Sequence, residues 1–389
     1  MLKVDCLVIG GGMVGAATAL SLADLGLKVA LVEAHAPQEY SPEQDFDLRV
    51  SAISLASEQL LQQLNAWQQV QNWRSCVYQR LGVWEDDIAY AEFNAEEIQQ
   101  PHLGHIIENR LIQLALWQQL EQKTNVTLLC PEQLDTFSQS SNKVIAQLTH
   151  SQVEANFIIG ADGANSKVRQ IAGIGITGWD YQQSAMLINV KTDQEQQNIT
   201  WQKFVPGGPL AFLPMPNNNA SLVWYQDKAE IKRLSALTNE QLQTEVLENF
   251  PKRLGNVEVI AKGAFPLTRR HANDYVKGRV VLLGDAAHTI NPLAGQGVNL
   301  GFKDVAALQN VIAKAIGSGE NYHDISVLKR YERSRRTDNL LMMTGMDAIY
   351  TTFANPSTPI KLLRNIGIFA AHRAPVLKKK ALAYACGVS

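Results

Sequence analysis

The chain has 389 residues, of which 46% are hydrophobic and 19% charged, and its formal net charge is −2. These values are typical of a globular protein with room for two domains, and the balanced charge argues against nucleic acid as a partner. No apolar stretch approaches the roughly 18 residues of a membrane span. The first expected strand begins by Lys3 or Val4, which leaves no room for a signal peptide. Scattered cysteines without metal or redox spacing predict a cytoplasmic protein without disulfides: Cys6, Cys76, Cys130 and Cys386.

The first 33 residues have the pattern of a dinucleotide-binding unit. The apolar run VDCLVIG is typical of a buried parallel strand, and it leads into Gly10, Gly12 and Gly15 with the spacing G-x-G-x-x-G. A helix follows, and then a second strand, KVALVE, which ends at Glu33. That acid lies about 20 residues beyond the glycines, where a partner for a ribose 2′-hydroxyl is expected. A glycine-rich turn without a ligand would leave the acid unexplained, so the pattern predicts a dinucleotide site.

A second glycine-rich stretch, GDAAHTINPLAGQGVN, occupies residues 284–299. The strand VVLL runs into Asp285, a turn contains Pro292, Gly295 and Gly297, and a helix is expected to begin near Val298. An acid at a strand end can accept hydrogen bonds from sugar-like hydroxyls. A helix start offers free N–H groups and a positive dipole end to an anion. A flavin needs both, for its ribityl hydroxyls and for the negative charge that its ring acquires on reduction.

The remaining pattern predicts an α/β fold with three parts. A Rossmann-like FAD-binding domain comprises 1–75, 102–178 and 268–345. An inserted, mostly antiparallel β-sheet domain for the substrate comprises 76–101 and 179–267, because its short strands are rich in aromatic and β-branched residues. One helix, NEQLQTEVLENF, interrupts that sheet, and a long helix is expected from about 322 to 350.

The third part, residues 346–389, is expected to be a basic amphipathic helical tail. After Asp347 the sequence has no acidic residue and six basic ones. Such a tail could lie on an anionic membrane or an acidic partner. It could equally be a terminal helical hairpin that packs on the body with a solvated basic face.

Three motifs resemble the flavin-dependent aromatic-ring monooxygenases of the para-hydroxybenzoate hydroxylase type. They are GGGMVG at 10–15, GADGANSKVR at 160–169 and GDAAHTINPLAGQGVNLG at 284–301. DLRVSAIS, IIENRLIQLALWQQL and FPLTRRHA narrow the resemblance to the ubiquinone-biosynthesis hydroxylases, which each oxidise one carbon of a polyprenylated ring. SAMLINV, ASLVWY and HRAPVLKKKALAYA are most similar to members that act on the 3-methyl-6-methoxy-1,4-benzoquinol ring.

The resemblance implies roles for individual residues of the cofactor site. Gly10, Gly12 and Gly15 would approach the FAD pyrophosphate, Glu33 would bind the adenosine ribose, and Asp285 would bind the ribityl chain. Further matches to FAD-contacting positions are Arg49, Arg110, Asp162, Gly163, Gly297, Val298 and Asn299, with Pro292 and Gly295 facing the flavin ring and its oxygen adduct.

Several of these residues also have a structural interpretation. Arg49 and Arg110 could form surface salt bridges, and Asp162 could cap the helix that starts near Ser166. His288 is an acid/base candidate, but a histidine in such a loop is more often a structural hydrogen-bonding group. Pocket candidates on the sheet strands are equally candidates for plain core: Trp201, Phe204, Phe212, Leu213, Trp224 and Tyr225.

The resemblance implies hydroxylation with O2 through a C4a-hydroperoxyflavin, with NAD(P)H as a transient reductant and a polyprenylated quinol as substrate. Since the cofactor performs the difficult step, the lack of a Ser/His/Asp or Cys/His constellation agrees with this mechanism. The implied location is cytoplasmic, with possible contact of the tail with the inner membrane or with a ubiquinone-biosynthesis complex. No metal is expected.

Three alternatives remain open from the sequence. The first is a hydroxylase acting at another ring position or on another phenol. The second is an FAD-dependent dehydrogenase or prenyl reductase, which shares the dinucleotide motifs. The third is a flavin-binding scaffold without catalytic activity.

Overall fold

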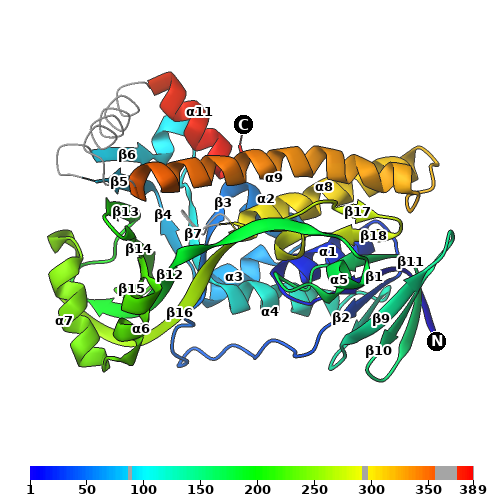
Figure 1. The fold of residues 1–389 in the computed structure, drawn as a ribbon, viewed down its shortest axis with the longest axis horizontal. Helices are drawn as coiled ribbons and strands as arrows, with labels where there is room; N and C mark the ends of the chain where they lie inside the picture. The colour runs from blue at the N-terminus through cyan, green and yellow to red at the C-terminus, as the bar shows by residue number, and fades with distance from the viewer. Residues whose placement is uncertain (86–89, 291–296, 355–374, 389) are drawn as a thin grey trace.

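The computed structural model describes residues 1–85, 90–290, 297–354 and 375–388. Pro292, Gly295 and residues 355–374 and 389 of the basic tail therefore lie outside the described residues. Figure 1 shows two large sheets side by side, with the long helix α9 (Ile325–Ala354) running across both of them. The mixed α/β fold that the sequence predicts is confirmed by this architecture.

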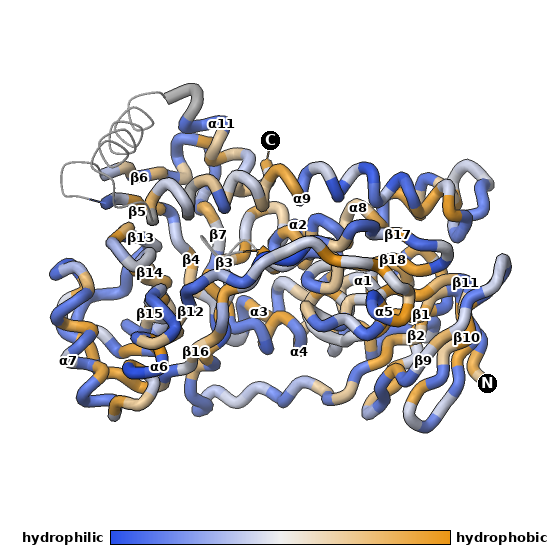
Figure 2. The backbone as a smooth tube through the Cα atoms, in the orientation of Figure 1, coloured by the Kyte–Doolittle hydropathy of each residue, from blue (hydrophilic) through white to orange (hydrophobic). Residues whose placement is uncertain are grey.

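The first sheet holds the amino-terminal strand at its centre. Its order is β17-β18-β11-β1-β2-β8, in which the strands from β18 to β8 run parallel, and β10 and β9 extend it antiparallel from β11. The parallel strands are largely apolar (Figure 2), and β2, β18 and the ends of β1 and β11 that lead into the site are buried, as expected for strands inside a covered parallel sheet. The bounds are β1 Leu2–Ile9, β2 Val29–Val32, β8 Val126–Leu129, β9 Leu134–Gln139, β10 Val144–Leu148, β11 Gln152–Gly160, β17 Val276–Lys277 and β18 Val280–Leu282.

The second sheet is antiparallel apart from one pair, β13 with β5. Its order is β19-β16-β12-β15-β14-β13-β5-β6, so the hairpin β5–β6 from early in the chain extends the sheet formed by the later strands. Two strands are much longer than the sequence pattern predicts, because β12 and β16 pair along most of their length. The bounds are β5 Arg80–Trp84, β6 Tyr90–Asn94, β12 Ile176–Thr192, β13 Ile199–Val205, β14 Gly208–Met215, β15 Asn219–Asp227, β16 Val257–Ala272 and β19 His288–Thr289.

A small third sheet joins the two large ones. Its order is β3 (Val50–Ser54), β7 (Gly104–Glu108) and β4 (Cys76–Tyr78). Residues 76–78 therefore pair with β7 rather than with the large antiparallel sheet. The division of the chain into FAD-binding and substrate domains stays a prediction.

Helices cover the sheets on the sides that bury apolar residues. The first sheet packs against α1 (Met13–Asp24), α4 (Asn109–Leu120) and α8 (Gly297–Gly317), and the second against α6 (Lys228–Ala236) and α7 (Asn239–Asn249). The sequence predicted α7 but not α6. The other helices are α2 Leu55–Gln63, α3 Trp67–Trp73, α5 Lys167–Ile171, α11 Pro375–Cys386 and the 3₁₀ turns η1 Ala95–Ile98, η2 Lys252–Leu254 and η3 Gly284–Ala286.

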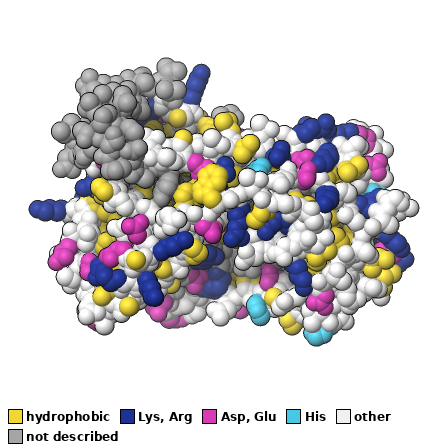
Figure 3. Space-filling model, in the orientation of Figure 1, with side chains coloured by type: hydrophobic (Ala, Val, Ile, Leu, Met, Phe, Trp, Pro, Cys, Tyr) yellow, Lys and Arg dark blue, Asp and Glu magenta, His cyan; other side chains and the backbone are white. Residues whose placement is uncertain are grey.

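The described part of the tail packs on the body. In α11, Leu382 and Cys386 are buried beside Leu103, and the ammonium of Lys378 lies 2.6 Å from a carboxylate oxygen of Glu97. Lys379 remains exposed. On the face drawn in Figure 3, acidic and basic side chains are interspersed. Among the described residues, no helix is long and apolar enough to cross a membrane.

Candidate active site

The glycine turn between β1 and α1 has the geometry of a dinucleotide cradle. Gly10 has a φ of +99°, and a Cβ there would lie 2.5 Å from the carbonyl oxygen of Ala161. A Cβ on Gly15 would overlap the carbonyl oxygen of Gly10. At Gly12, by contrast, a Cβ would meet nothing within 4 Å. Gly10 and Gly15 therefore let the turn and helix pack closely, while Gly12 leaves open space in front of the helix start.

Hydrogen bonds from two sides hold this turn in place. A carboxylate oxygen of Glu33 accepts from the Gly11 N–H at 2.6 Å, and the carbonyl oxygen of Gly11 accepts from Trp117 Nε1 at 2.8 Å and Gln113 Nε2 at 2.9 Å. No side chain caps the first turn of α1, so its N–H groups are available to an anion. Glu33 thus lies beside the turn at the end of β2, where a ribose partner was predicted.

A cavity of about 920 Å³ extends from this turn across the second sheet to α11. Its size is within the usual range of small-molecule sites. Of the predicted cofactor residues it contains Gly12, Arg49, Gly163, Asp285, Gly297 and Val298. The starts of α1 and α8, distant in sequence, therefore face one cavity.

Asp285 lies in this cavity at the turn that follows β18. Its side chain is exposed to the cavity, yet the surrounding protein desolvates it and raises its pKa, an effect that the nearby charges of His288 and Arg49 partly oppose. A carboxylate that is open to the cavity but poorly hydrated gains from hydroxyl donors. The geometry suits a polyhydroxylated chain.

Two other predicted cofactor residues make structural contacts. The guanidinium of Arg110 donates to Asp47 at 2.9 Å and to the carbonyls of Gln38 and Glu39, and it is not part of the cavity lining. One oxygen of Asp162 accepts from the N–H groups of Lys167 and Val168, as a helix cap does. Its other oxygen is buried without a hydrogen-bond partner among the described residues. The structural interpretations of both residues therefore have direct support, and FAD contacts remain predictions.

The side chain of Asn299 points away from the cavity. Its oxygen accepts from Ser57 Oγ at 2.7 Å and the Ser54 N–H at 3.0 Å, and its amide donates to the Ala52 carbonyl at 2.8 Å. These bonds fasten the first turn of α8 to β3 and α2.

Strand alternation separates the predicted pocket residues. Ala211 and Leu213 of β14 and Val223 and Tyr225 of β15 line the cavity. The neighbouring Phe212 and Trp224 point to the opposite face of the sheet. With Trp201, they belong to the hydrophobic core against α6 and α7. Trp201 contributes to the lining, but it is almost fully buried and its ring stacks on Phe212, and Phe204 stacks on Phe353 instead.

A buried ionic network lies behind the Asp285 turn. Asp304 of α8 is fully buried, and one of its oxygens accepts from the Gly284 N–H at 3.1 Å and lies 2.5 Å from His288 Nε2. The other oxygen accepts from Arg335 Nε at 2.8 Å and Asn339 Nδ2 at 3.1 Å. His288 is 2% exposed. It therefore has a structural hydrogen-bonding role here, while the sequence did not identify Asp304 or Arg335.

The far end of the cavity is apolar and is closed by helices that the sequence did not connect with a site. Its lining there includes Leu81, Leu103, Met342, Met346 and Leu382. Met342 and Met346 come from α9 and Leu382 from α11, all of them more than 230 residues after β7. Only the amphipathic pattern of these helices could have suggested such packing.

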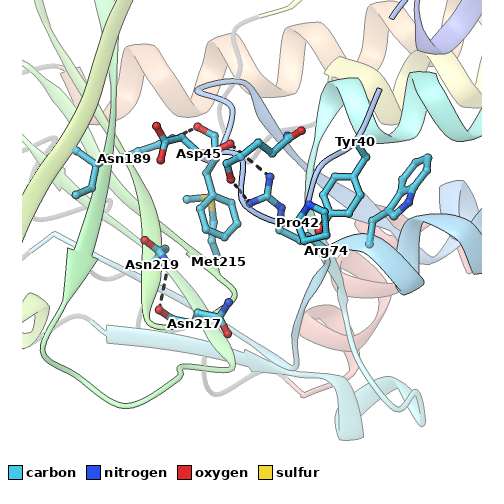
Figure 4. A pocket seen from close by; sticks show the side chains of 12 residues that line it. Tyr40, Pro42, Asp45, Arg74, Asn189, Met215, Asn217 and Asn219 are labelled. Atoms are coloured by element: carbon cyan, nitrogen blue, oxygen red, sulfur yellow. Dashed lines mark hydrogen bonds between the residues drawn. The ribbon is translucent and has the colours of Figure 1, made fainter. Parts of the chain in front are cut away.

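A second cavity, of about 480 Å³, lies between the 40–46 segment and the second sheet. Figure 4 shows Arg74 beside Tyr40 and Pro42 on one side and Asn189 and Asn219 on the other. The guanidinium of Arg74 is held by Glu108 at 3.1 Å. None of the predicted site residues lines this cavity, so the larger cavity is the candidate active site.

The residues of the larger cavity fit FAD. The open space at Gly12 and Gly163, the uncapped start of α1 and the cavity-facing Asp285 together offer contacts of the kind that its pyrophosphate and hydroxyls require, and Glu33 lies beside the same turn. The fold and this site define an FAD-dependent monooxygenase. The FAD binding domain family matches residues 3–342, and the chain belongs to it.

Sequence and structure comparisons agree with this assignment. The chain is 48% identical over 382 residues to the Escherichia coli 3-demethoxyubiquinol 3-hydroxylase, covering 98% of each chain. It is 31% identical over 437 residues to the human ubiquinone biosynthesis monooxygenase COQ6, covering 98% of this chain and 92% of the relative. The p-nitrophenol 4-monooxygenase PnpA from Pseudomonas putida has the same fold, with a TM-score of 0.82 at 19% identity over 98% and 97% of the two chains. The predicted family is thus confirmed.

Proposed function

We propose that this chain hydroxylates the ring of a polyprenylated benzoquinol in ubiquinone biosynthesis, at the 3-methyl-6-methoxy-1,4-benzoquinol step. The observation that carries the proposal is the 48% identity, over 98% of both chains, to a relative named for the hydroxylation of 3-demethoxyubiquinol. The human relative is also named for ubiquinone biosynthesis. NAD(P)H is the proposed reductant, and O2 the second substrate.

In the proposed reaction, bound FAD supplies the activation of O2, and the protein binds, orients and shields. Gly12 and the start of α1 would hold the pyrophosphate, Glu33 the adenosine ribose and Asp285 the ribityl hydroxyls. The starts of α1 and α8 both face the cavity, so their dipoles favour negative charge there.

The second sheet would position the quinol ring. Leu213, Val223 and Tyr225 present a largely apolar surface to the same cavity that contains Asp285. Such a surface excludes water from the reacting oxygen and holds the ring in contact distance. The apolar end formed by Leu103 and Leu382 is the proposed place for the first units of the prenyl chain.

The deciding experiment is mass spectrometry of the quinone lipids in cells that lack this protein. The proposal predicts accumulation of the methylated, mono-methoxylated precursor, and its loss when the gene is restored. Accumulation of an earlier phenolic intermediate would agree with the proposed enzyme class but refute the proposed ring position. A normal ubiquinone profile would refute the pathway.

A measurement of turnover without O2 distinguishes an FAD-dependent dehydrogenase or prenyl reductase from the proposed hydroxylase. A hydroxylase requires O2 for product formation, whereas a dehydrogenase or prenyl reductase reduces or oxidises its substrate without it. If the variant Asp285→Ala loses FAD but still supports quinone synthesis, this result would favour the third alternative, a flavin-binding scaffold without catalytic activity.

We also keep the proposal that the basic tail contacts a membrane or a biosynthetic complex. Removing the residues after about 355 is expected to lower membrane association or complex formation more than FAD binding. In α11, however, Lys378 is already paired with Glu97 and Leu382 is buried. A truncated chain that fractionates unchanged and only loses stability would show that the tail is structural.

A further inference from the structure

Glu58, His102 and His105 converge at a place that the flavin chemistry does not use. Glu58 is on α2, His105 is in β7, and His102 lies two residues before that strand. His102 Nε2 is 2.7 Å and His105 Nδ1 3.5 Å from the same oxygen of Glu58. All three atoms lie within 4.8 Å of one another.

The three side chains are enclosed but can be reached from outside. Their exposed fractions are 11% for Glu58, 15% for His102 and 7% for His105. The second oxygen of Glu58 accepts from Gln62 Nε2 at 3.1 Å, and the ring of His105 packs edge-on against Trp67. Neighbours of this kind fix the orientation of potential metal ligands.

One nitrogen of the cluster is also available to a cation. His105 Nδ1 is buried, and within the described part of the chain it forms no hydrogen bond of good geometry, because the Glu58 oxygen 3.5 Å away is at the limit of such a bond. A buried nitrogen without a partner is unfavourable by about 1–3 kcal/mol. A metal ion would use that nitrogen.

We propose that Glu58, His102 and His105 bind a zinc ion. Two imidazole nitrogens and one carboxylate oxygen are a ligand set of zinc, whereas calcium and magnesium prefer oxygen alone. Zinc ligands at about 2.0–2.2 Å in tetrahedral geometry lie roughly 3.4 Å apart. The His105–Glu58 separation of 3.5 Å matches this value, and the His102–Glu58 separation of 2.7 Å would have to widen slightly around an ion. Three protein ligands leave a fourth position for water.

The ion would join α2 to the segment before β7. Leu103, between the two histidines, packs against Leu382 and Cys386 of α11. The zinc site is therefore expected to stabilise the corner on which α11 rests. This inference does not depend on the proposed substrate.

The test uses the full-length, FAD-loaded chain without a histidine tag. After equilibration with zinc and gel filtration, mass spectrometry of the metal content should find about one zinc ion per chain, and a chromogenic chelator gives the affinity. Glu58→Gln keeps the size and a hydrogen bond to His102 but removes the charge. It should weaken zinc affinity about 100-fold or more.

Two further variants make the result specific. Bound zinc should raise the Tm of the wild-type chain by about 2 °C. His102→Ala removes the most exposed of the three ligands, so it is the substitution least able to disturb folding. It should abolish both the retention of zinc and this rise in Tm. His150→Ala removes an exposed histidine elsewhere and should change neither. The flavin absorption spectrum confirms that each variant holds FAD. Absence of zinc from the wild-type chain, or equal zinc binding by all four proteins, would overturn the proposal.

Discussion

Substitution of Asp304 by Asn tests whether the buried network positions the cavity turn. Asp304 connects three parts of the chain, because it accepts from the Gly284 N–H, from Arg335 and from Asn339, and it lies against His288. Asn has the same shape but no charge, so the change removes the ionic contribution with little change in volume.

The magnitude follows from the pKa of Asp304. Burial would raise this pKa, but the charges and hydrogen bonds of His288 and Arg335 lower it from 3.8 to about 2. A lowering of this order corresponds to about 2–3 kcal/mol of folding stability at pH 7. Arg335 keeps its second ion pair, 2.5 Å to Asp338, so we expect Asp304→Asn to lower the free energy of unfolding by about 2–3 kcal/mol rather than by the larger values of a fully orphaned buried charge.

The pH dependence has a defined sign. Because the folded-state pKa is lower than the unfolded one, the contribution of Asp304 is complete above about pH 5 and is lost as the pH falls through 4 toward 2. The difference between wild type and variant should therefore shrink in that window. Urea unfolding followed by circular dichroism gives the stability, and the flavin released on gel filtration reports on the turn.

Glu320→Gln is the matched control. It breaks an Arg–carboxylate pair that involves α9, with Arg330, but both side chains are about 40% exposed. Its expected effect is below about 1 kcal/mol. If Asp304→Asn costs no more than this control and retains FAD fully, the network does not position the turn.

Three further changes test the cavity itself. Asp285→Ala removes the cavity-facing carboxylate and should weaken FAD binding about 10- to 100-fold, measured by flavin fluorescence titration, with little change in the apoprotein Tm. Gly12→Val fills the open space at the start of α1, so the chain should fold with a Tm within a few degrees of wild type but fail to retain FAD in gel filtration. Leu382→Ala opens the apolar end of the cavity and should lower kcat/KM about tenfold for a prenylated quinol but much less for a short-chain analogue; equal losses on both would refute the chain-binding role.

The cofactor half of the site was predictable because its signals are local. Gly10, Gly12, Gly15 and Glu33 lie within one strand–helix–strand unit, and steric exclusion of a Cβ at Gly10 and Gly15 explains why glycine is needed there. The Asp285 turn likewise follows a short apolar strand. In each case the fold of about 30 residues determines where the side chain points.

The substrate half of the site was less predictable from the sequence, because mostly large aromatic side chains on the strands were chosen as pocket candidates. Phe212 and Trp224 are large and aromatic, and for that reason they fill the core under α6 and α7. The smaller Ala211 and Val223 line the cavity on the opposite face of the same strands. Alternation along β14 and β15 separates the two sets, but which face meets the cavity depends on where the first sheet packs, and no local pattern contains that information.

The cofactor side and the substrate side of the cavity therefore differ in how well they tolerate amino-acid substitutions. On the cofactor side, the proposed contacts come mainly from backbone at glycine turns and helix starts. The turn that carries Asp285 is fastened through the Gly284 N–H to Asp304, which also binds Arg335. A substitution there disturbs packing or leaves a buried charge without its partner. On the sheet side and at α11, Leu213, Val223 and Leu382 contribute apolar surface whose size can vary while the strands remain paired. Selectivity for the substrate ring and its prenyl chain is thus expected to depend on Leu213, Val223 and Leu382, while the cofactor side of the cavity tolerates little change.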